Sequence, residues 1–289
     1  MVTPPVLQAF LTWADRERSI HAITLFGTWA QGRTTADSDF DLQLVTSEPG
    51  RFEDRGWVAG IPGWRILAYA VRDATGGARK VTLLLEGAEF DFVIVPAHRL
   101  RLARLLVRCG LHRTSRRLAR ALGPLAVVMR PAHQVVRGGP GWARFYERVV
   151  REVPDPRLDR DAVLALAETA YVDLHWILGK IDRGELVAAQ RWLHRTPVEV
   201  NLRLLTESRQ RRGLDPVFDG RRSEMLLTPA ELHEVRISAA LEPAALTAAV
   251  LHCEATLRRR VLELTAAPAP WPALMPRTAL IPPGAGPAA

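Results

Sequence analysis

The sequence predicts an α+β protein: an N-terminal domain with a mixed sheet and flanking helices, followed by a C-terminal helical bundle. Short apolar runs separated by turn residues fill residues 18–96, whereas long helical patterns dominate after residue 142. The chain has 289 residues, of which 48% are hydrophobic, and is therefore long enough to build more than one core.

The N-terminal domain is expected to begin with a helix over residues 4–16, where a proline precedes apolar residues at near-helical spacing. Residues 27–32 read as a tight turn or a short helix between two strands. The apolar runs predict five strands, at residues 20–26, 39–45, 64–71, 80–85 and 89–95.

The pattern changes after residue 96. Residues 100–122 are arginine-rich and helical in pattern, residues 124–129 are expected to form a short strand, and residues 130–142 have the proline and glycine content of a connection. Further helices are expected at 142–152, 160–183, 185–212, 229–240 and 243–266. These expectations define a first domain over residues 1–130, a linker over 131–141, a helical domain over 142–267, and a disordered tail rich in proline and alanine over 268–289.

The positive charge is concentrated in one segment. The net charge is +8, but residues 98–151 hold 13 arginines and one acid, so the rest of the chain is at −4. In this segment Arg101, Arg104 and Arg108 form a stripe at helical spacing, which could bind phosphates or RNA or could simply face solvent. Aromatic residues do not interleave with the stripe, and a nucleic-acid partner is therefore not expected.

The sequence also bounds the cellular class of the protein. No apolar stretch approaches the roughly 20 residues of a membrane span, and the first residues carry no basic region ahead of an apolar one. We therefore expect a cytoplasmic protein without a membrane partner, and we favour a monomer. The two cysteines fit neither a metal-ligand spacing nor a disulfide scaffold.

The most informative stretch joins the first two predicted strands. Gly27 and Thr28 follow the first strand, and Ser38, Asp39 and Asp41 lead into the second. Alternate residues of a strand share a face, so the two carboxylates point the same way. Two like charges 4 Å apart near a protein surface repel by about 4 kcal/mol. A divalent cation would remove this repulsion, and a glycine before a helix start lets a phosphate approach the backbone.

This spacing resembles the signature of the nucleotidyltransferase superfamily that includes DNA polymerase beta. In that signature a Gly-Ser pair opens a short helix and an Asp-x-Asp pair follows, which here correspond to Gly27, Thr28, Asp39 and Asp41. The first 96 residues are similar to the N-terminal domain of bacterial aminoglycoside 6-adenylyltransferases and of related lincosamide nucleotidyltransferases. The resemblance implies that Gly27, Thr28 and Ser38 bind the nucleotide, and that Asp39 and Asp41 bind metal.

The superfamily pattern also implies a third carboxylate on a later strand, as a metal ligand or as the base toward the attacking hydroxyl. The segment "AEFDFVIVP" offers Glu89 and Asp91. Asp91 lies deeper in the apolar run and is favoured, with Glu89 as the reserve.

The resemblance therefore implies an Mg²⁺-dependent nucleotidyltransferase that moves AMP from ATP onto a hydroxyl of a small molecule. An aminoglycoside-type antibiotic is the expected acceptor, and an acidic pocket using Glu168, Glu185 or Glu199 would suit its positive charge. The alternative is a protein of the same fold that acts on a protein or RNA acceptor, as a toxin–antitoxin component or a non-catalytic regulator. The acceptor and the choice between ATP and GTP stay open at this point.

Overall fold

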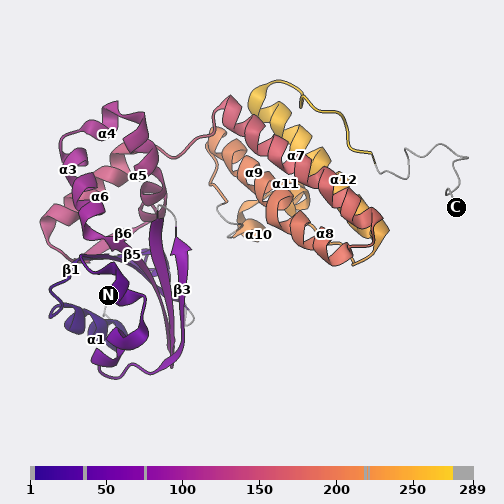
Figure 1. Cartoon of the computed structure of the whole chain (residues 1–289). Coiled ribbons are helices and arrows are strands. Elements are labelled where there is room, and N and C mark those ends of the chain that lie inside the picture. Colours follow the sequence, from indigo (N-terminus) through magenta and orange to yellow (C-terminus); the bar gives the residue numbers. More distant parts are fainter. Residues whose placement is uncertain (1–3, 35–37, 75–76, 218–219, 221, 276–289) are drawn as a thin grey trace, which may run out of the picture. The chain divides into compact units, whose positions relative to one another are not determined.

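The computed structural model describes residues 4–34, 38–74, 77–217, 220 and 222–275. The chain divides into two compact units, Met1–Pro156 (unit 1) and Arg157–Ala289 (unit 2), and each unit is described by itself (Figure 1). The α+β class and the helical C-terminal region are both as the sequence predicted.

Within the described residues, unit 1 contains one mixed sheet of six strands in the order β3-β4-β5-β2-β1-β6. The central strands β2 and β5 are parallel, and the other neighbouring pairs are antiparallel. The strands are β1 (Ile20–Phe26), β2 (Phe40–Thr46), β3 (Ile66–Ala74), β4 (Ala78–Leu85), β5 (Ala88–Pro96) and β6 (His133–Arg137).

Both faces of this sheet are covered, and each face has its own apolar cluster. Helix α1 and the 3₁₀ helices η1 and η2 pack on one face through Phe10, Phe52 and Trp57. Helices α3, α5 and α6 pack on the other. The helical elements are α1 (Pro5–Ala14), α2 (Gly27–Ala30), η1 (Pro49–Phe52), η2 (Arg55–Gly60), α3 (Ala97–Arg108), α4 (Leu111–Thr114), α5 (Arg116–Met129) and α6 (Pro140–Glu152).

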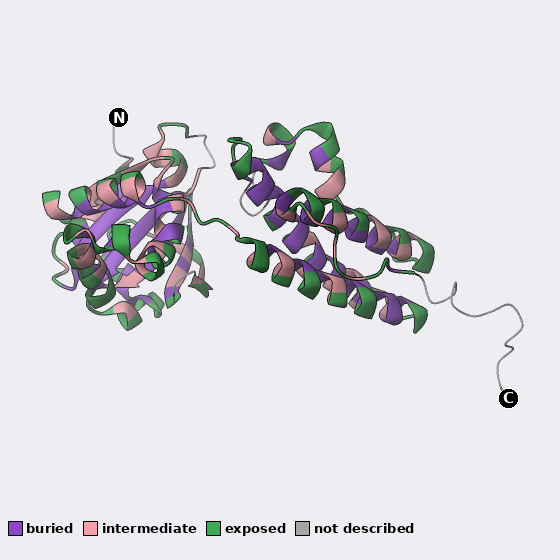
Figure 2. Cartoon of the chain, turned by 90° about the horizontal axis from the view of Figure 1, so that it is seen from above, coloured by how far each residue is buried: buried purple, intermediate pink, exposed green. Residues whose placement is uncertain are grey.

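Strand β2 shows why the sequence turns apolar directly after its acids. Leu42 and Leu44 face the α1 side of the sheet, and Val45 packs on the α3–α6 side, so the strand is buried on both faces. Figure 2 shows the same arrangement: the central strands are buried, and the helices around them expose their outer faces. A central strand of this kind reads as a nearly continuous apolar run.

Two segments of unit 1 after residue 120 differ from the sequence-based expectation. The expected strand at 124–129 is the second half of α5, because Leu122, Ala126 and Met129 are buried at helical spacing. The segment 131–141, expected as a linker, contains β6, which pairs with β1 along Ile23–Phe26 and completes the sheet. Unit 1 accordingly includes α6 and ends at Pro156 rather than near residue 130.

The described part of unit 2 consists of helices, of which α7 and α12 are the longest, around a large apolar cluster. Leu205, Val217 and Leu227 form a second, smaller cluster. The single helix expected over residues 185–212 is interrupted by a π-helical turn at Pro197, because proline lacks the backbone N–H that a continuous α-helix requires. The elements are α7 (Arg160–Asp182), α8 (Leu186–Leu193), η4 (His194–Val198), α9 (Glu199–Arg211), α10 (Ser223–Leu226), α11 (Pro229–Val235) and α12 (Pro243–Thr265).

Helix α7 is, within the described residues, the one helix long and apolar enough to cross a membrane by length and composition. Its residues Ala167, Leu174 and Ile177 are fully buried in the core of unit 2. The core helix of a soluble bundle meets the same criterion, so this composition is weak evidence for a membrane span.

The beginning of the segment expected as a disordered tail packs on unit 2. Trp271 lies against Tyr171, with ring centroids 5.3 Å apart, and Leu274 is buried in the apolar cluster. Arg258 of α12 donates hydrogen bonds to the carbonyl oxygens of Trp271 and Pro272. Residues 276–289 lie outside the described part of the chain.

Candidate metal centre

Three carboxylates converge at one end of the two central strands of unit 1. One side-chain oxygen from each of Asp39, Asp41 and Asp91 lies within 4.8 Å of the others. Asp41 and Asp91 are paired neighbours in the parallel β2–β5 ladder, and Asp39 precedes Asp41 by two residues. Residues that pair in a ladder share a face of the sheet, so the strand register itself brings these groups together.

Gly27 makes room for one of these carboxylates. Its backbone is in the left-handed region, with φ +71°, and a Cβ at this position would lie 2.2 Å from Oδ2 of Asp41. Any side chain would therefore meet both the backbone strain and a collision with Asp41. The carboxylate of Asp41 thus occupies the space that a side chain at Gly27 would need.

A column of aromatic rings supports the site from the opposite face of the sheet. Trp29 stacks on Phe40 at 4.5 Å, and Phe40 stacks on Phe90 at 4.7 Å between ring centroids. The indole N–H of Trp29 donates to the carbonyl oxygen of Ser38 at 3.1 Å. Phe40 lies between Asp39 and Asp41 in the chain, so this stacking fixes the direction in which both acids point.

Asp91 is the buried member of the group, with 6% of its surface exposed. Its Oδ1 accepts a hydrogen bond from the Thr82 hydroxyl at 2.6 Å, and its Oδ2 lies 2.5 Å from Nζ of Lys80. Thr82 pairs directly with Asp91 in the β4–β5 ladder, and Lys80 is two residues away on the same face. A buried carboxylate with two such partners is held in a single orientation.

The sequence analysis missed Lys80 and Thr82. One signal was available, because Lys80 is one of only two lysines in the chain and it alternates with Thr82 in an otherwise apolar strand. Which carboxylate they would meet depends on the pairing of β4 with β5, which the sequence did not show.

The other predicted site residues lie as follows. Glu89 is exposed and is not part of the carboxylate group, so of the two candidates for the third acid only Asp91 joins Asp39 and Asp41. Thr28 is exposed on α2, and Ser38 is half-buried where the chain enters β2.

The three carboxylates and Lys80 together have the donor set and the charge for one divalent cation. The formal charges of the four groups leave two negative charges, which a divalent ion would balance. All three ligand groups offer oxygen, the donor that Mg²⁺ and Ca²⁺ prefer. The arrangement therefore fits a hard metal ion.

Helix α6 is anchored to the same face of the sheet. The Tyr146 hydroxyl donates to Oε1 of Gln43 at 2.6 Å, and Gln43 follows Asp41 by two residues on β2. Burial raises the pKa of Tyr146 well above its ordinary value, so the phenol stays protonated as a hydrogen-bond donor. This buried bond fixes α6 over the interior of the strand whose first residues carry the acids.

The acids proposed for a cationic acceptor do not form a comparable group in unit 2. Glu168 and Glu199 are exposed. Glu185 pairs with Lys180 and, at 2.7 Å, with Arg183. The hydrogen bonds from Lys180 and Arg183 lower the pKa of Glu185, and its charge is already matched within the unit.

Comparison with known proteins finds only distant similarity. No protein-family model matches the chain, and no curated protein matches its sequence. An aminoglycoside 6-adenyltransferase from Bacillus subtilis matches at 11% identity and a TM-score of 0.38, over 90% of this chain and 89% of that one. A nucleotidyltransferase-like protein from Exiguobacterium sibiricum 255-15 matches at 12% identity and a TM-score of 0.37, over 90% and 76% respectively. At these TM-scores the similarity does not establish a shared fold, so any functional assignment depends on the carboxylate group itself.

Proposed function

We propose that this chain is an Mg²⁺-dependent nucleotidyltransferase that moves AMP from ATP onto a hydroxyl of a small molecule. The observation that carries the proposal is the group of Asp39, Asp41 and Asp91 beside a glycine that has to lack a side chain. This combination supports a metal centre next to accessible backbone, which is what the transfer of a charged phosphoryl group requires.

Each residue has a role in this proposal. Asp39, Asp41 and Asp91 would hold Mg²⁺, while Gly27, Thr28 and Ser38 would bind the phosphates of ATP. The ion, when bound, neutralises the triphosphate and the departing pyrophosphate. The stacking of Trp29 on Phe40, and the hydrogen bond from Trp29 to Ser38, hold α2 against the start of β2.

Asp91 is held in place by two neighbours. Its Oδ1 accepts a hydrogen bond from Thr82, and its Oδ2 forms an ion pair with Lys80. We therefore assign Asp91 to the metal centre. Glu89 is the alternative base named by the sequence, but it is exposed and lies outside the group.

The acceptor is proposed from the sequence resemblance alone. That resemblance favours an aminoglycoside-type hydroxyl, with unit 2 as the acceptor-binding part of a cytoplasmic, monomeric enzyme. Of the three acids that the sequence named for this role, Glu168 and Glu199 are exposed and could attract such a cation.

A mass-shift screen tests the reaction. The protein is incubated with Mg²⁺, ATP or GTP, and a panel of aminoglycosides and lincosamides, and each acceptor is weighed for an added nucleoside monophosphate. We expect an AMP adduct with the native chain, none with Asp39→Asn or Asp91→Asn, and an undiminished yield with the matched control Glu89→Gln. An adduct on protein or RNA alone would contradict the small-molecule acceptor, and no adduct on any acceptor would contradict the proposed chemistry.

Metal binding provides a readout that does not depend on the acceptor. Titration of the native chain with Mn²⁺, followed by electron paramagnetic resonance, should show a bound ion that Mg²⁺ displaces. Asp41→Asn should abolish that binding, because it removes one of the three carboxylate ligands. Equal Mn²⁺ affinity in the variant and the native chain would show that the carboxylates are not a metal centre.

A further inference from the structure

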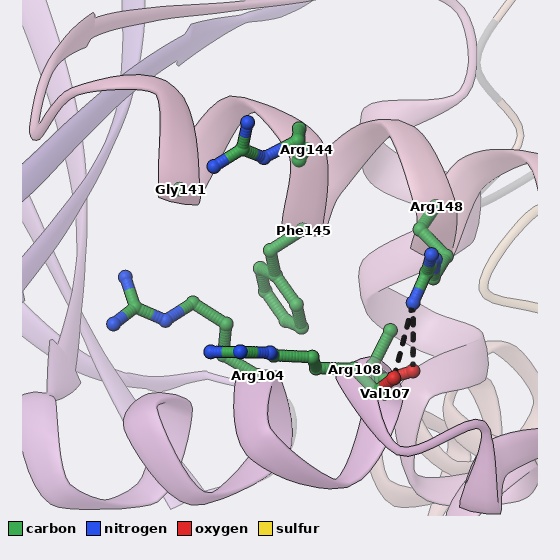
Figure 3. Close-up of a pocket in the computed structure, with 7 residues that line it drawn as sticks. All are labelled: Arg104, Val107, Arg108, Gly141, Arg144, Phe145 and Arg148. Carbon is green, nitrogen blue, oxygen red and sulfur yellow. Dashed lines mark hydrogen bonds between the residues drawn. The ribbon is translucent and has the colours of Figure 1, made fainter.

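A second charged site lies in unit 1, between helices α3 and α6. It is a pocket of about 420 Å³ with four arginines around it (Figure 3). Arg104 and Arg108 come from α3, and Arg144 and Arg148 come from α6. Two of the three arginines in the stripe that the sequence showed on α3, Arg104 and Arg108, thus lie in one wall of a pocket, and α6 supplies the other wall.

Two of these arginines are held in place in part by uncharged groups. The guanidinium of Arg104 lies over the ring of Trp142, 4.5 Å from its centroid. Arg148 donates to the carbonyl oxygens of Val107 and Arg108, at 3.3 Å each, as the dashed lines in Figure 3 show. These contacts orient the side chains without adding a negative charge.

Carboxylates are nearly absent from the surroundings. No acid lines the pocket among the residues that the structure describes. The acid in contact with one of its arginines is Glu152, whose Oε1 lies 3.6 Å from Nε of Arg148 and which also binds Arg113 and Arg151. Arg108 and Arg144 are exposed and make no ion pair within the described residues.

The floor of the pocket strengthens the effect of these charges. Phe145 and Val107 form it, and they are 3% and 1% exposed. Charges set around a low-dielectric wall focus their field into the space between them, and four cations there repel one another until an anion enters. The arginine-rich composition of the chain explains how many arginines there are, but not why they converge from two helices on one apolar floor.

We propose that this pocket binds a small ligand carrying several phosphate groups, such as a di- or triphosphate. Guanidinium groups match the oxygens of an oxyanion two at a time, which favours phosphate over a halide. The several negative charges of a di- or triphosphate balance four arginines better than the single charge of a carboxylate ion does. A pocket of about 420 Å³ has the size of a compact ligand, which favours such a ligand over the backbone of a long nucleic acid. The pocket is built from α3 and α6 and not from β2 and β5, so this inference does not depend on the proposed transferase activity.

The test is calorimetric titration of the full chain with inorganic tripolyphosphate, in chelator so that the metal centre is not loaded. The pocket variant Arg108→Gln/Arg144→Gln removes two exposed guanidiniums. The matched control Arg116→Gln/Arg117→Gln removes the same charge from α5, where both arginines are exposed and outside the pocket. We expect the pocket variant to weaken binding by about tenfold or more, and the control by less than about twofold, because direct phosphate contacts exceed the effect of net charge.

Three results would overturn the proposal. An unchanged affinity for tripolyphosphate in the pocket variant would show that the anion binds elsewhere. An equal loss of affinity in the pocket variant and the control would show that only the overall charge of the protein matters. Single-stranded RNA that binds in a manner dependent on Arg108 and Arg144, while tripolyphosphate does not bind, would assign the surface to nucleic acid. Circular dichroism melting of each variant verifies that the fold is intact.

Discussion

Both units of this protein contain ion pairs, such as Lys80–Asp91 in unit 1 and Arg209–Glu231 in unit 2, but the two clusters of like charge described above lie in unit 1. Unit 1 gathers like charges: three carboxylates lie within 4.8 Å of one another, and four arginines surround one pocket. Unit 2 pairs opposite charges in and around its core, as in Arg209–Glu231, Arg211–Glu207, Arg258–Glu254 and Arg260–Glu234.

The difference suggests a test of where charged ligands bind. A buried pair of opposite charges satisfies itself and needs nothing from outside the chain. A group of like charges raises the energy of the folded protein until a counter-ion or a charged ligand arrives. The carboxylates and arginines of unit 1 therefore point to ligands, whereas the ion pairs of unit 2 point to structure.

The largest expected effect tests the structural half of this comparison. Glu231→Gln should lower the free energy of unfolding by about 3–5 kcal/mol, because it leaves the buried Arg209 without its partner at 2.7 Å. Urea denaturation measures the loss, and Glu224→Gln, an exposed acid on α10, is the control. A loss no larger than that of the control would show that the pair contributes little to unit 2.

This contribution has a defined pH dependence. Burial alone would raise the pKa of Glu231, but hydrogen bonds from Thr228 and Arg212 and the charge on Arg209 hold that pKa below its ordinary value. Stability from this group is therefore fully present above the ordinary pKa of glutamate. It should be lost as the pH falls from there through the lowered pKa of the folded state, and the Glu231→Gln chain should lack that part of the acid transition.

The next effect concerns the end of the chain. Truncation after Ala267 should cost unit 2 about 2–4 kcal/mol, because it removes the buried Leu274 and the ring of Trp271 from the apolar cluster. Truncation after Met275 keeps both residues and is the control, for which we expect no change in melting temperature. Equal stability of the two truncated chains would show that the packing of Trp271 and Leu274 does not stabilise unit 2.

A smaller effect separates backbone strain from site geometry. Gly27→Ala and Gly63→Ala both place a side chain at positive φ, which should cost each about 1–2 kcal/mol of stability. A Cβ at Gly63 would meet nothing within 4 Å, whereas at Gly27 it would meet Asp41. Only Gly27→Ala should therefore lose Mn²⁺ binding. Full Mn²⁺ affinity in the Gly27→Ala variant would show that Mn²⁺ binding does not require a glycine at this position.

The smallest effect tests the energetic cost of the gathered carboxylates. Asp39→Asn should leave the protein in chelator as stable as the native chain, or more stable by up to about 1 kcal/mol, because one like charge is removed. The same variant should lose the rise in melting temperature that Mg²⁺ gives the native chain. Clearly lower stability in chelator would assign Asp39 a structural role. The exposed Glu89→Gln should change neither quantity.

The sequence by itself was sufficient for the local features of unit 1. Strand β1 has the bounds expected from its apolar run, and β2 and β5 agree within a residue at each end. The spacing of Gly27, Asp39 and Asp41 also predicted that the two carboxylates lie together, because residues two apart on a strand share a face whatever surrounds them.

Only the tertiary structure could decide what depends on pairing between distant segments. His133–Arg137 is a strand because β1 offers it an open edge, although its own residues read as a connection. Lys80 lies next to Asp91 because of the β4–β5 register. The arginines of α3 and α6 line the same pocket although Arg104 and Arg144 are 40 residues apart in the chain. Local propensity and periodicity act over a few residues, whereas strand register and helix packing are set by the whole fold. The positive charge beside the third carboxylate and the second wall of the arginine pocket are therefore seen only in the tertiary structure.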